Sequence, residues 1–240
     1  MPASESGLGK VAVITGGSRG IGLAMACAFA DSGYNVVIMG HNAARLEKAM
    51  QELKRGPQAQ GLLCDVRDAG SVANAFRHIA EKHPSIHVLV NNAGIAHALA
   101  PVEELPIATW REVIDTNLTG TFLVTRAALP LMQAGSTVVN NLSVAAVQPF
   151  AGMSAYNASK FGAMGFTQAL REDVRKKGIR VLALLPGATD TDIWQQFWPD
   201  APREKMISPE TVAHAVVHAV AAPASTAIEE IRIGPVAGVL

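Results

Sequence analysis

Residues 11–22, VAVITGGSRGIG, decide the fold class of this chain. The first five are apolar or β-branched and predict a buried strand, and the run from Ile21 onward has the composition of a helix. A glycine-rich turn joins the two, where backbone N–H groups and the helix dipole can hold a pyrophosphate. Its spacing is GxxxGxG rather than the GxGxxG of the commonest dinucleotide fingerprint. A turn that packs strand against helix without a ligand is therefore the alternative.

The same alternation of strand and helix continues along the rest of the chain. Further strand-like runs lie at 34–40, 59–66, 87–94, 136–144, 179–187 and 228–233. Because each run is nearly all apolar, both faces of its strand should be covered by helices. The pattern predicts an α/β fold with a doubly wound parallel sheet and helices on both faces. We expect a flexible tail at 1–9 and a single dinucleotide-binding domain at 10–240.

Local signals set the expected boundaries in the second half of the chain. Three helices are expected there, at 109–132, 155–177 and 209–221. The first prediction rests on the capping-box spacing of Thr109 and Glu112, and the third on Ser208 as N-cap with Pro209 in the first turn. Between the second and third of these helices, at 188–207, aromatic residues lie among Pro, Asp and Lys without a regular spacing. We interpret this segment as a flap on the substrate side.

The composition excludes several classes of partner. Twenty Lys plus Arg balance twenty Asp plus Glu among 240 residues, and no basic block is present, so nucleic acid and anionic lipid are not expected to bind. Cys27 and Cys64 lie in apolar runs without paired spacing and are interpreted as core thiols in a reducing compartment. Neither a signal peptide nor a long apolar run is evident, which predicts a cytoplasmic protein with no membrane contact. A neutral small molecule is the expected partner.

The end of the second strand-like run indicates which cofactor would bind. An NAD site places Asp or Glu there for the ribose 2′-hydroxyl, but His41 and Asn42 follow the strand. With Arg19 in the turn, Arg45 one turn further on and Asn42 able to cap the helix, the pocket suits a 2′-phosphate. NADP(H) is therefore favoured over NAD(H). The alternative for both arginines is solvated surface charge.

Three residues in the second half could form a proton-transfer site. Tyr156 and Lys160 are i, i+4 neighbours on one helical face, and Ser143 follows the strand VVNNLSV, at the edge where ligands bind in open parallel sheets. A tyrosine with a pKa near 10 must be acidified by about three units to work near neutrality. We predict that the ammonium of Lys160 supplies the stabilisation of about 4 kcal/mol that this needs.

Five segments together carry a family resemblance. They are TGGSRGIG at 15–22, NNAG at 91–94, Ser143, YNASK at 156–160 and PGATDT at 186–191. The chain resembles, from about residue 10 to its end, the single-domain short-chain dehydrogenase/reductases, which implies a Rossmann-type catalytic domain. The resemblance implies that Ser143 hydrogen-bonds the substrate oxygen, that Tyr156 protonates or deprotonates it, and that Lys160 holds the nicotinamide ribose.

The resemblance also assigns a relay residue and the cofactor cleft. It implies that Asn117 anchors a water beside Lys160, although by itself Asn117 would be a polar residue within a helix that has an incidental partner. Asp65 is implied to lie near the adenine, whereas its position alone indicates a turn residue. The complete set expected to bind the cofactor is Gly16, Ser18, Arg19, Gly20, Ile21, Gly22, His41, Asn42, Arg45, Asp65, Val66, Asn91, Ala93, Gly94, Tyr156, Lys160, Pro186, Gly187, Thr189 and Thr191.

Some residues depart from the family pattern. His41 stands where relatives that use NADP often have Arg, Leu142 precedes the serine where a small residue is usual, and Asn141 puts an amide into an apolar strand. The first bears on cofactor preference and the others on the substrate pocket. Ser143, Tyr156 and Lys160 are unaffected.

Histidine and aromatic residues outside these motifs suggest other roles. His214 and His218 have the i, i+4 spacing of metal ligands, but no third ligand is nearby and no metal is expected. Trp194, Phe197 and Trp198 could clamp an apolar substrate or could be buried against the core or a partner subunit. His97, just past NNAG, could reach a substrate from its loop, but a solvated histidine is the favoured interpretation.

The expected reaction is reversible reduction of a carbonyl to a secondary alcohol, with Tyr156 delivering the proton and Ser143 stabilising the oxyanion. The alternatives are a reductase of carrier-bound 3-ketoacyl thioesters and a nucleotide-sensing protein without catalysis. The resemblance further implies a homodimer or homotetramer packed through the two long helices at 109–132 and 155–177.

Overall fold

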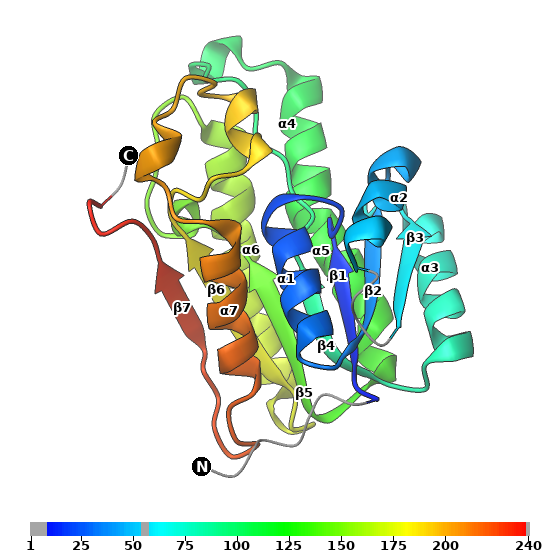
Figure 1. Cartoon of the computed structure of the whole chain (residues 1–240). Helices are drawn as coiled ribbons and strands as arrows, with labels where there is room; N and C mark the ends of the chain where they lie inside the picture. The colour runs from blue at the N-terminus through cyan, green and yellow to red at the C-terminus, as the bar shows by residue number, and fades with distance from the viewer. Residues whose placement is uncertain (1–8, 54–57, 239–240) are drawn as a thin grey trace.

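The computed structural model describes residues 9–53 and 58–238, so the predicted tail lies, apart from Gly9, outside the described residues. Within these ranges seven strands form one parallel sheet in the order β3-β2-β1-β4-β5-β6-β7 (Figure 1). The strands are β1 Val11–Thr15, β2 Asn35–Gly40, β3 Ala59–Leu63, β4 Ile86–Asn91, β5 Met132–Asn141, β6 Arg180–Pro186 and β7 Glu230–Ile233. The predicted α/β fold with a doubly wound sheet is confirmed.

Helices cover both faces of the sheet, because alternate strand residues point to opposite sides. In β1, Ala12 and Ile14 belong to one buried cluster and Val11 and Val13 to another. The first cluster is covered by α1 Gly20–Asp31, α2 Ala43–Glu52 and α7 Pro209–Val220 (Figure 1). The second is covered by α3 Ala69–Lys82, α5 Gly120–Ala128 and α6 Ser154–Arg175. Burial is weaker on the edge strands β3 and β7, which have a neighbour on one side only.

The long helix predicted at 109–132 differs from the observed one. Helix α4, Ile107–Ile114, begins after Pro106, whose carbonyl accepts the N–H of Trp110, so Thr109 is not an N-cap. A π-turn at Asp115–Thr119 connects α4 to α5. After α5 a short 3₁₀ turn that contains a proline ends the helical run, and β5 begins at Met132, four residues earlier than predicted.

Two other local predictions are confirmed. Helix α6 spans Ser154–Arg175, close to the expected 155–177. Helix α7 begins at Pro209, and the Ser208 side chain accepts a hydrogen bond from the N–H of Thr211, as an N-cap should.

No helix in the described ranges is long and apolar enough to cross a membrane. Cys64 is buried, but Cys27 is only partly so.

Candidate functional site

A cleft of about 750 Å³ runs along the carboxyl ends of the strands. Strand β1 lies between β2 and β4, so the connections after β1 and β4 leave toward opposite sides of the sheet (Figure 1). In open parallel sheets, ligands bind at this point. The cleft is therefore where the sheet topology would place a dinucleotide.

The glycine-rich turn forms one wall of this cleft and is tied to the end of β4. The Thr15 hydroxyl accepts hydrogen bonds from the backbone N–H groups of Asn92 and Ala93, at 2.9 and 3.0 Å. The Asn92 amide donates to the carbonyls of Thr15 and Gly16, at 3.0 and 3.1 Å. Gly16 has a φ of 61°, and a Cβ there would lie 2.9 Å from the Ala93 Cα. Glycine at this position thus permits both the turn and the close approach.

Two predicted cofactor residues, Asn91 and Gly22, lie outside the cleft. The Asn91 amide is buried and donates to Thr125 and Asn140, at 2.8 Å each, while Asn140 donates in turn to Thr167. Its neighbour Asn92 lines the cleft instead. The expectation for Asn91 therefore needs correction. Asn91 ends β4 and Asn92 follows it, and adjacent residues of an extended chain face opposite sides, so the sequence did not reveal which one faces the ligand.

The ends of β2 and β3 lie side by side at one end of the cleft, which we call the adenine end. The backbone N–H of Cys64 donates to the carbonyl of Gly40, at 2.9 Å, so His41 and Asp65 follow adjacent strand ends. Asn42 caps α2 by accepting the N–H of Arg45, at 2.9 Å, as expected. The cleft is also lined by predicted residues of the glycine-rich turn and of the adenine end, namely Ser18, Arg19, Gly20, Ile21, Arg45 and Val66. Gly22 packs against Asn92 and does not line the cleft.

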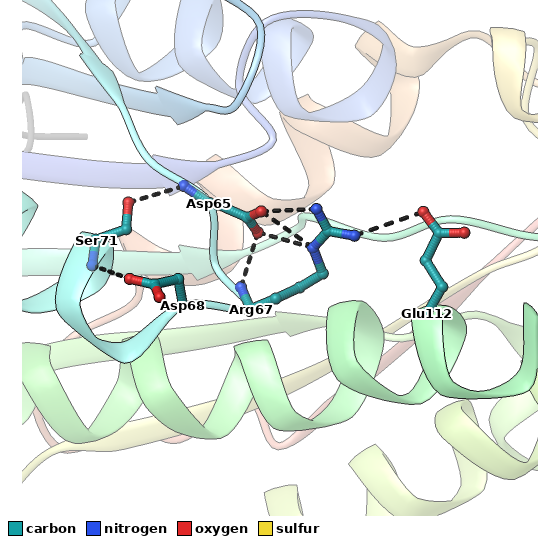
Figure 2. Close-up of polar contacts among 5 residues, drawn as sticks. All are labelled: Asp65, Arg67, Asp68, Ser71 and Glu112. Carbon is teal, nitrogen blue, oxygen red and sulfur yellow. Dashed lines mark hydrogen bonds and ion pairs between the residues drawn. The ribbon is translucent and has the colours of Figure 1, made fainter. Parts of the chain in front are cut away.

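Two ion pairs lie among the residues that line the cleft. Arg19 lies 3.6 Å from Asp192, which joins the glycine-rich turn to the flap. Arg67 pairs with Asp65, their closest atoms 2.7 Å apart (Figure 2). Hydrogen bonding to Arg67 lowers the pKa of Asp65, and the same contact raises the pKa of Arg67. Sequence reasoning missed Arg67, although its position two residues after Asp65 is a detectable signal.

Ser143, Tyr156 and Lys160 come together at the other end of the cleft, as predicted, and all three line it. We call this the catalytic end. Ser143 caps a short turn, with its hydroxyl 3.1 Å from the N–H of Ala145, and has a φ of 151° and a ψ of 161°. This conformation is nearly exclusive to glycine, and strain of about 1–3 kcal/mol at such a residue is typical of functional sites. The hydroxyls of Ser143 and Tyr156 are hydrogen-bonded, an interaction that lowers the tyrosine pKa.

The electrostatics of Tyr156 differ from the prediction. Burial raises the pKa of Tyr156 by more than the hydrogen bond to Ser143 lowers it. Lys160 lies with its Nζ 5.5 Å from the centre of the tyrosine ring and donates to the carbonyl of Asn141, at 3.1 Å. Burial also lowers the pKa of Lys160 to about 8. Both groups therefore favour their neutral forms, because removal from water penalises either charge.

The π-turn places Asn117 behind this site. Its side-chain oxygen accepts the N–H of Ile95, and its amide donates to the carbonyl of Ile95 and to the hydroxyl of Ser159, all at 2.9–3.0 Å. A Cβ on Gly94 would lie 3.3 Å from the Asn117 oxygen and 3.7 Å from Lys160 Nζ. Asn117 is thus close to Lys160, but it does not line the cleft. Its amide fixes the chain after β4 to α6.

The segment expected to be a flap covers the catalytic end. Trp194 donates to the carbonyl of Thr189, at 2.8 Å, and the side chain of Gln196 accepts the N–H of Ala96, at 2.9 Å. Trp194 lies 4.9 Å from Phe197 and 6.0 Å from Trp198 between ring centres. All three aromatic rings line the cleft, as do Pro186, Gly187, Thr189 and Thr191. The flap is therefore tied to the loop after β4 through Gln196, is braced internally by Trp194, and presents aromatic surface to the cleft.

The histidines His97, His214 and His218 lie in different environments. His97 is buried, with Nδ1 2.8 Å from the carbonyl oxygen of Ala98 and with Nε2 lacking a partner among the described residues. The prediction of a solvated histidine is wrong, because the loop after β4 folds under the flap anchor at Ala96. His214 and His218 are exposed on α7. The described residues contain no group of three or more His, Cys, Asp or Glu placed to hold a metal ion.

Comparisons with known proteins agree with this geometry. A family model described as short chain dehydrogenase matches residues 10–202. Sulfoacetaldehyde reductase 2 from Chromohalobacter salexigens is 36% identical over 188 residues, 77% of this chain and 75% of that protein. A short chain dehydrogenase from Burkholderia cenocepacia, solved with NADP, shares 33% identity with a TM-score of 0.86, covering 95% of this chain and 98% of that one. A 3-ketoacyl-(acyl-carrier-protein) reductase from Brucella melitensis, solved with NADH, shares 28% identity with a TM-score of 0.86, covering 95% and 98%.

Proposed function

We propose a specific reaction for this chain, which belongs to the short-chain dehydrogenase/reductase family and is an oxidoreductase acting on an alcohol or carbonyl group. It uses NADP(H) to reduce a ketone or another carbonyl reversibly to a secondary alcohol. The observation that carries this proposal is the convergence of Ser143, Tyr156 and Lys160 on one wall of the cleft. Fold alone would not support it, since one fold serves many functions.

The side chains divide the proton chemistry between them. Ser143 donates a hydrogen bond to the carbonyl oxygen and stabilises the charge that develops there. Tyr156 is protonated near neutral pH, because burial raises its pKa, and it is therefore ready to donate its proton to that oxygen during reduction. Lys160, whose pKa of about 8 lies near neutrality, can lose or gain a proton beside the tyrosine ring. When bound, the nicotinamide supplies or accepts the hydride.

The residues present fit a dinucleotide with a 2′-phosphate. The glycine-rich turn offers N–H groups at the start of α1, and Gly16 leaves space that a Cβ would fill. No carboxylate follows β2, where His41 and Arg45 are exposed and line the cleft. One structural neighbour was solved with NADP and another with NADH. The preference for NADP(H) therefore rests on the residues of this chain.

The catalytic end suits a carbonyl that carries an apolar group. Its lining is dominated by Leu99, Phe150, Met153, Trp194, Phe197 and Trp198. Apolar and aromatic lining with a few polar groups is typical of small-molecule sites. A carrier-bound 3-ketoacyl thioester is the alternative substrate, because an acyl chain would also fit such a surface. A panel of ketones, α-diketones and ketoacyl thioesters, each tested with NADPH and NADH, distinguishes the two. Oxidation of NADPH by any of them excludes a purely nucleotide-sensing protein.

Replacing Tyr156 by Phe tests the assignment, because it removes the hydroxyl and keeps the ring. We expect kcat to fall by about 10²–10⁴-fold, the usual contribution of a positioned acid. NADPH affinity, measured by fluorescence titration, should change by less than about twofold, since the phenyl ring still occupies its place. Tyr34→Phe is the matched control, because Tyr34 packs edge to face on Phe29 in the core and does not line the cleft. Full activity of Tyr156→Phe would contradict the proposal.

We further propose that the chain forms homodimers or homotetramers through α4, α5 and α6. Phe122 on α5 and Phe161 on α6 are each 45% exposed, and Phe122 packs edge to face on Phe166. Large aromatic side chains exposed together on neighbouring helices are typical of subunit interfaces. Sedimentation velocity at micromolar concentration should then give the mass of two or four chains. A monomer at that concentration would count against this packing.

A further inference from the structure

Arg67 is a cation held among carboxylates at the adenine end of the cleft. Its Nε and Nη2 donate to both oxygens of Asp65, at 2.7–3.1 Å, and its Nη1 lies 3.5 Å from Glu112 on α4 (Figure 2). The charge of Asp115 acts on Arg67 as well. Asp65, Arg67 and Glu112 all line the cleft. A single guanidinium therefore lies among three carboxylates, two of which line the ligand space, and its one positive charge lowers the negative potential there.

These charges lie next to the position where the 2′-phosphate is proposed to bind. Asp65 and His41 follow adjacent strand ends, which the hydrogen bond from Cys64 to Gly40 holds together. The charge of His41 also contributes to the low pKa of Asp65, which places the two side chains within electrostatic range. Arg45 lines the same part of the cleft. An uncompensated Asp65 would therefore repel a phosphate at this position.

A carboxylate at this position would affect binding of the two forms of the nicotinamide cofactor differently. A carboxylate near the adenosine ribose favours a 2′-hydroxyl, because the hydroxyl can donate to it and a phosphate cannot. A 2′-phosphate adds close to two negative charges, so its binding depends more steeply on the local potential than binding of the unphosphorylated form. The bidentate contact with Arg67 occupies both oxygens of Asp65 and cancels its charge.

We propose that Arg67 sets the cofactor preference of this chain, by masking Asp65 and Glu112 so that a 2′-phosphorylated dinucleotide can bind. This inference rests on the proposed use of NADP(H). Arg67 acts through the carboxylates and needs no contact of its own with the phosphate. It is therefore a specificity-determining residue at the adenine end, where His41 and not an arginine follows β2.

The test is calorimetric titration at low salt with two fragments, 2′,5′-ADP and 5′-AMP, which differ only in the 2′-phosphate. The measured quantity is the ratio of the two dissociation constants. In Arg67→Gln, binding of 2′,5′-ADP should weaken by about tenfold and binding of 5′-AMP by less than about threefold. Glu112→Gln should shift the ratio toward 2′,5′-ADP, and the double variant should recover part of the loss. High salt should shrink all of these differences, because Glu112 and Arg67 are partly exposed.

Two variants separate charge from structure. Arg67→Lys keeps the charge but loses the bidentate contact, and it should retain most of the preference. Arg77→Gln removes an exposed arginine of α3 that lies outside the cleft, and it should leave the ratio unchanged. If Arg67→Gln weakens both fragments equally, or if Arg67→Lys loses as much preference as Arg67→Gln, the charge-masking role is wrong.

The same titration tests the proposed function separately. The absolute ratio in the unaltered chain decides whether NADP(H) is preferred at all, and the change of that ratio in Arg67→Gln decides the role of Arg67. A chain that binds both fragments equally, but whose Arg67→Gln variant binds 5′-AMP better than 2′,5′-ADP, would remove the proposed preference and keep the role of Arg67.

Discussion

The two ends of the cleft hold their charges in opposite ways. At the adenine end, Arg67 has a side chain 42% exposed and is paired with Asp65 and Glu112. At the catalytic end, Lys160 is 6% exposed, and it donates a hydrogen bond to the neutral carbonyl of Asn141. Ion pairing shifts the pKa values of Asp65 and Arg67 toward their charged forms, whereas burial shifts those of Lys160 and Tyr156 toward their neutral forms.

This difference separates binding from chemistry within one cleft. Groups whose charges are stabilised suit recognition of a charged ligand, since they stay ionised across the physiological pH range. At the catalytic end, burial brings the pKa of Lys160 to about 8, so it can exchange protons near neutral pH, while Tyr156 keeps the proton that it is proposed to donate. Substitutions at the adenine end should therefore change the affinity for cofactor fragments. Substitutions at the catalytic end should change turnover, substrate choice and pH dependence.

The largest effect expected from the flap concerns substrate choice. Trp198→Ala removes an aromatic surface from the catalytic end, while Trp194 stays anchored to the carbonyl of Thr189. We expect kcat/KM for an aryl ketone to fall by about tenfold or more, because loss of apolar contact costs about 1–3 kcal/mol. For a small aliphatic ketone the change should stay within about twofold. Initial rates of NADPH oxidation with both substrates measure this.

Trp110→Ala is the matched control for the flap variant. Trp110 is also partly exposed, but it lies on α4 and does not line the cleft. It should leave the ratio of kcat/KM values for the two ketones unchanged. Equal losses for both ketones in Trp198→Ala would mean that the flap holds the site together without selecting an apolar substrate.

The fold was predictable because its signals are local and repeated. Unbroken apolar runs predicted strands covered on both faces, and Ser208 with Pro209 predicted the start of α7. The error at α4 to β5 arose because a capping-box spacing also occurs within a helix, at Thr109. The π-turn at Asp115–Thr119 could not be predicted, since it depends on the contacts that Asn117 makes with distant segments.

The site was predictable where its residues lie within a short motif and less so where they meet through the fold. Tyr156 and Lys160 share a helix face, and Ser143 lies two residues after the end of β5. The contact between Arg67 and Glu112 joins segments far apart in the sequence. The pKa of Tyr156 was predicted in the wrong direction, because the distance to Lys160 was assumed and the cost of burial was left out.

The smallest effect expected is on stability, and it contrasts the two cations directly. Burial lowers the pKa of Lys160 in the folded chain from 10.5 to about 8, so the unfolded chain binds more protons between these pH values. Stability therefore rises with pH across this window and is lost as the pH falls through about 8. From pH 7 to pH 9, the free energy of unfolding should rise by about 1 kcal/mol more in the unaltered chain than in Lys160→Met.

Urea unfolding at the two pH values measures this difference, because all other titrating groups are shared by the two chains. Arg67→Met provides the contrast at the adenine end. Arginine stays protonated throughout this range, so Arg67→Met should change the free energy of unfolding by the same amount at pH 7 and pH 9. If Lys160→Met also changes the free energy of unfolding by the same amount at pH 7 and pH 9, Lys160 does not change its protonation in this window. Tyr156 would then lie beside a permanent cation, and the contrast between the two ends of the cleft would no longer be one of charge state.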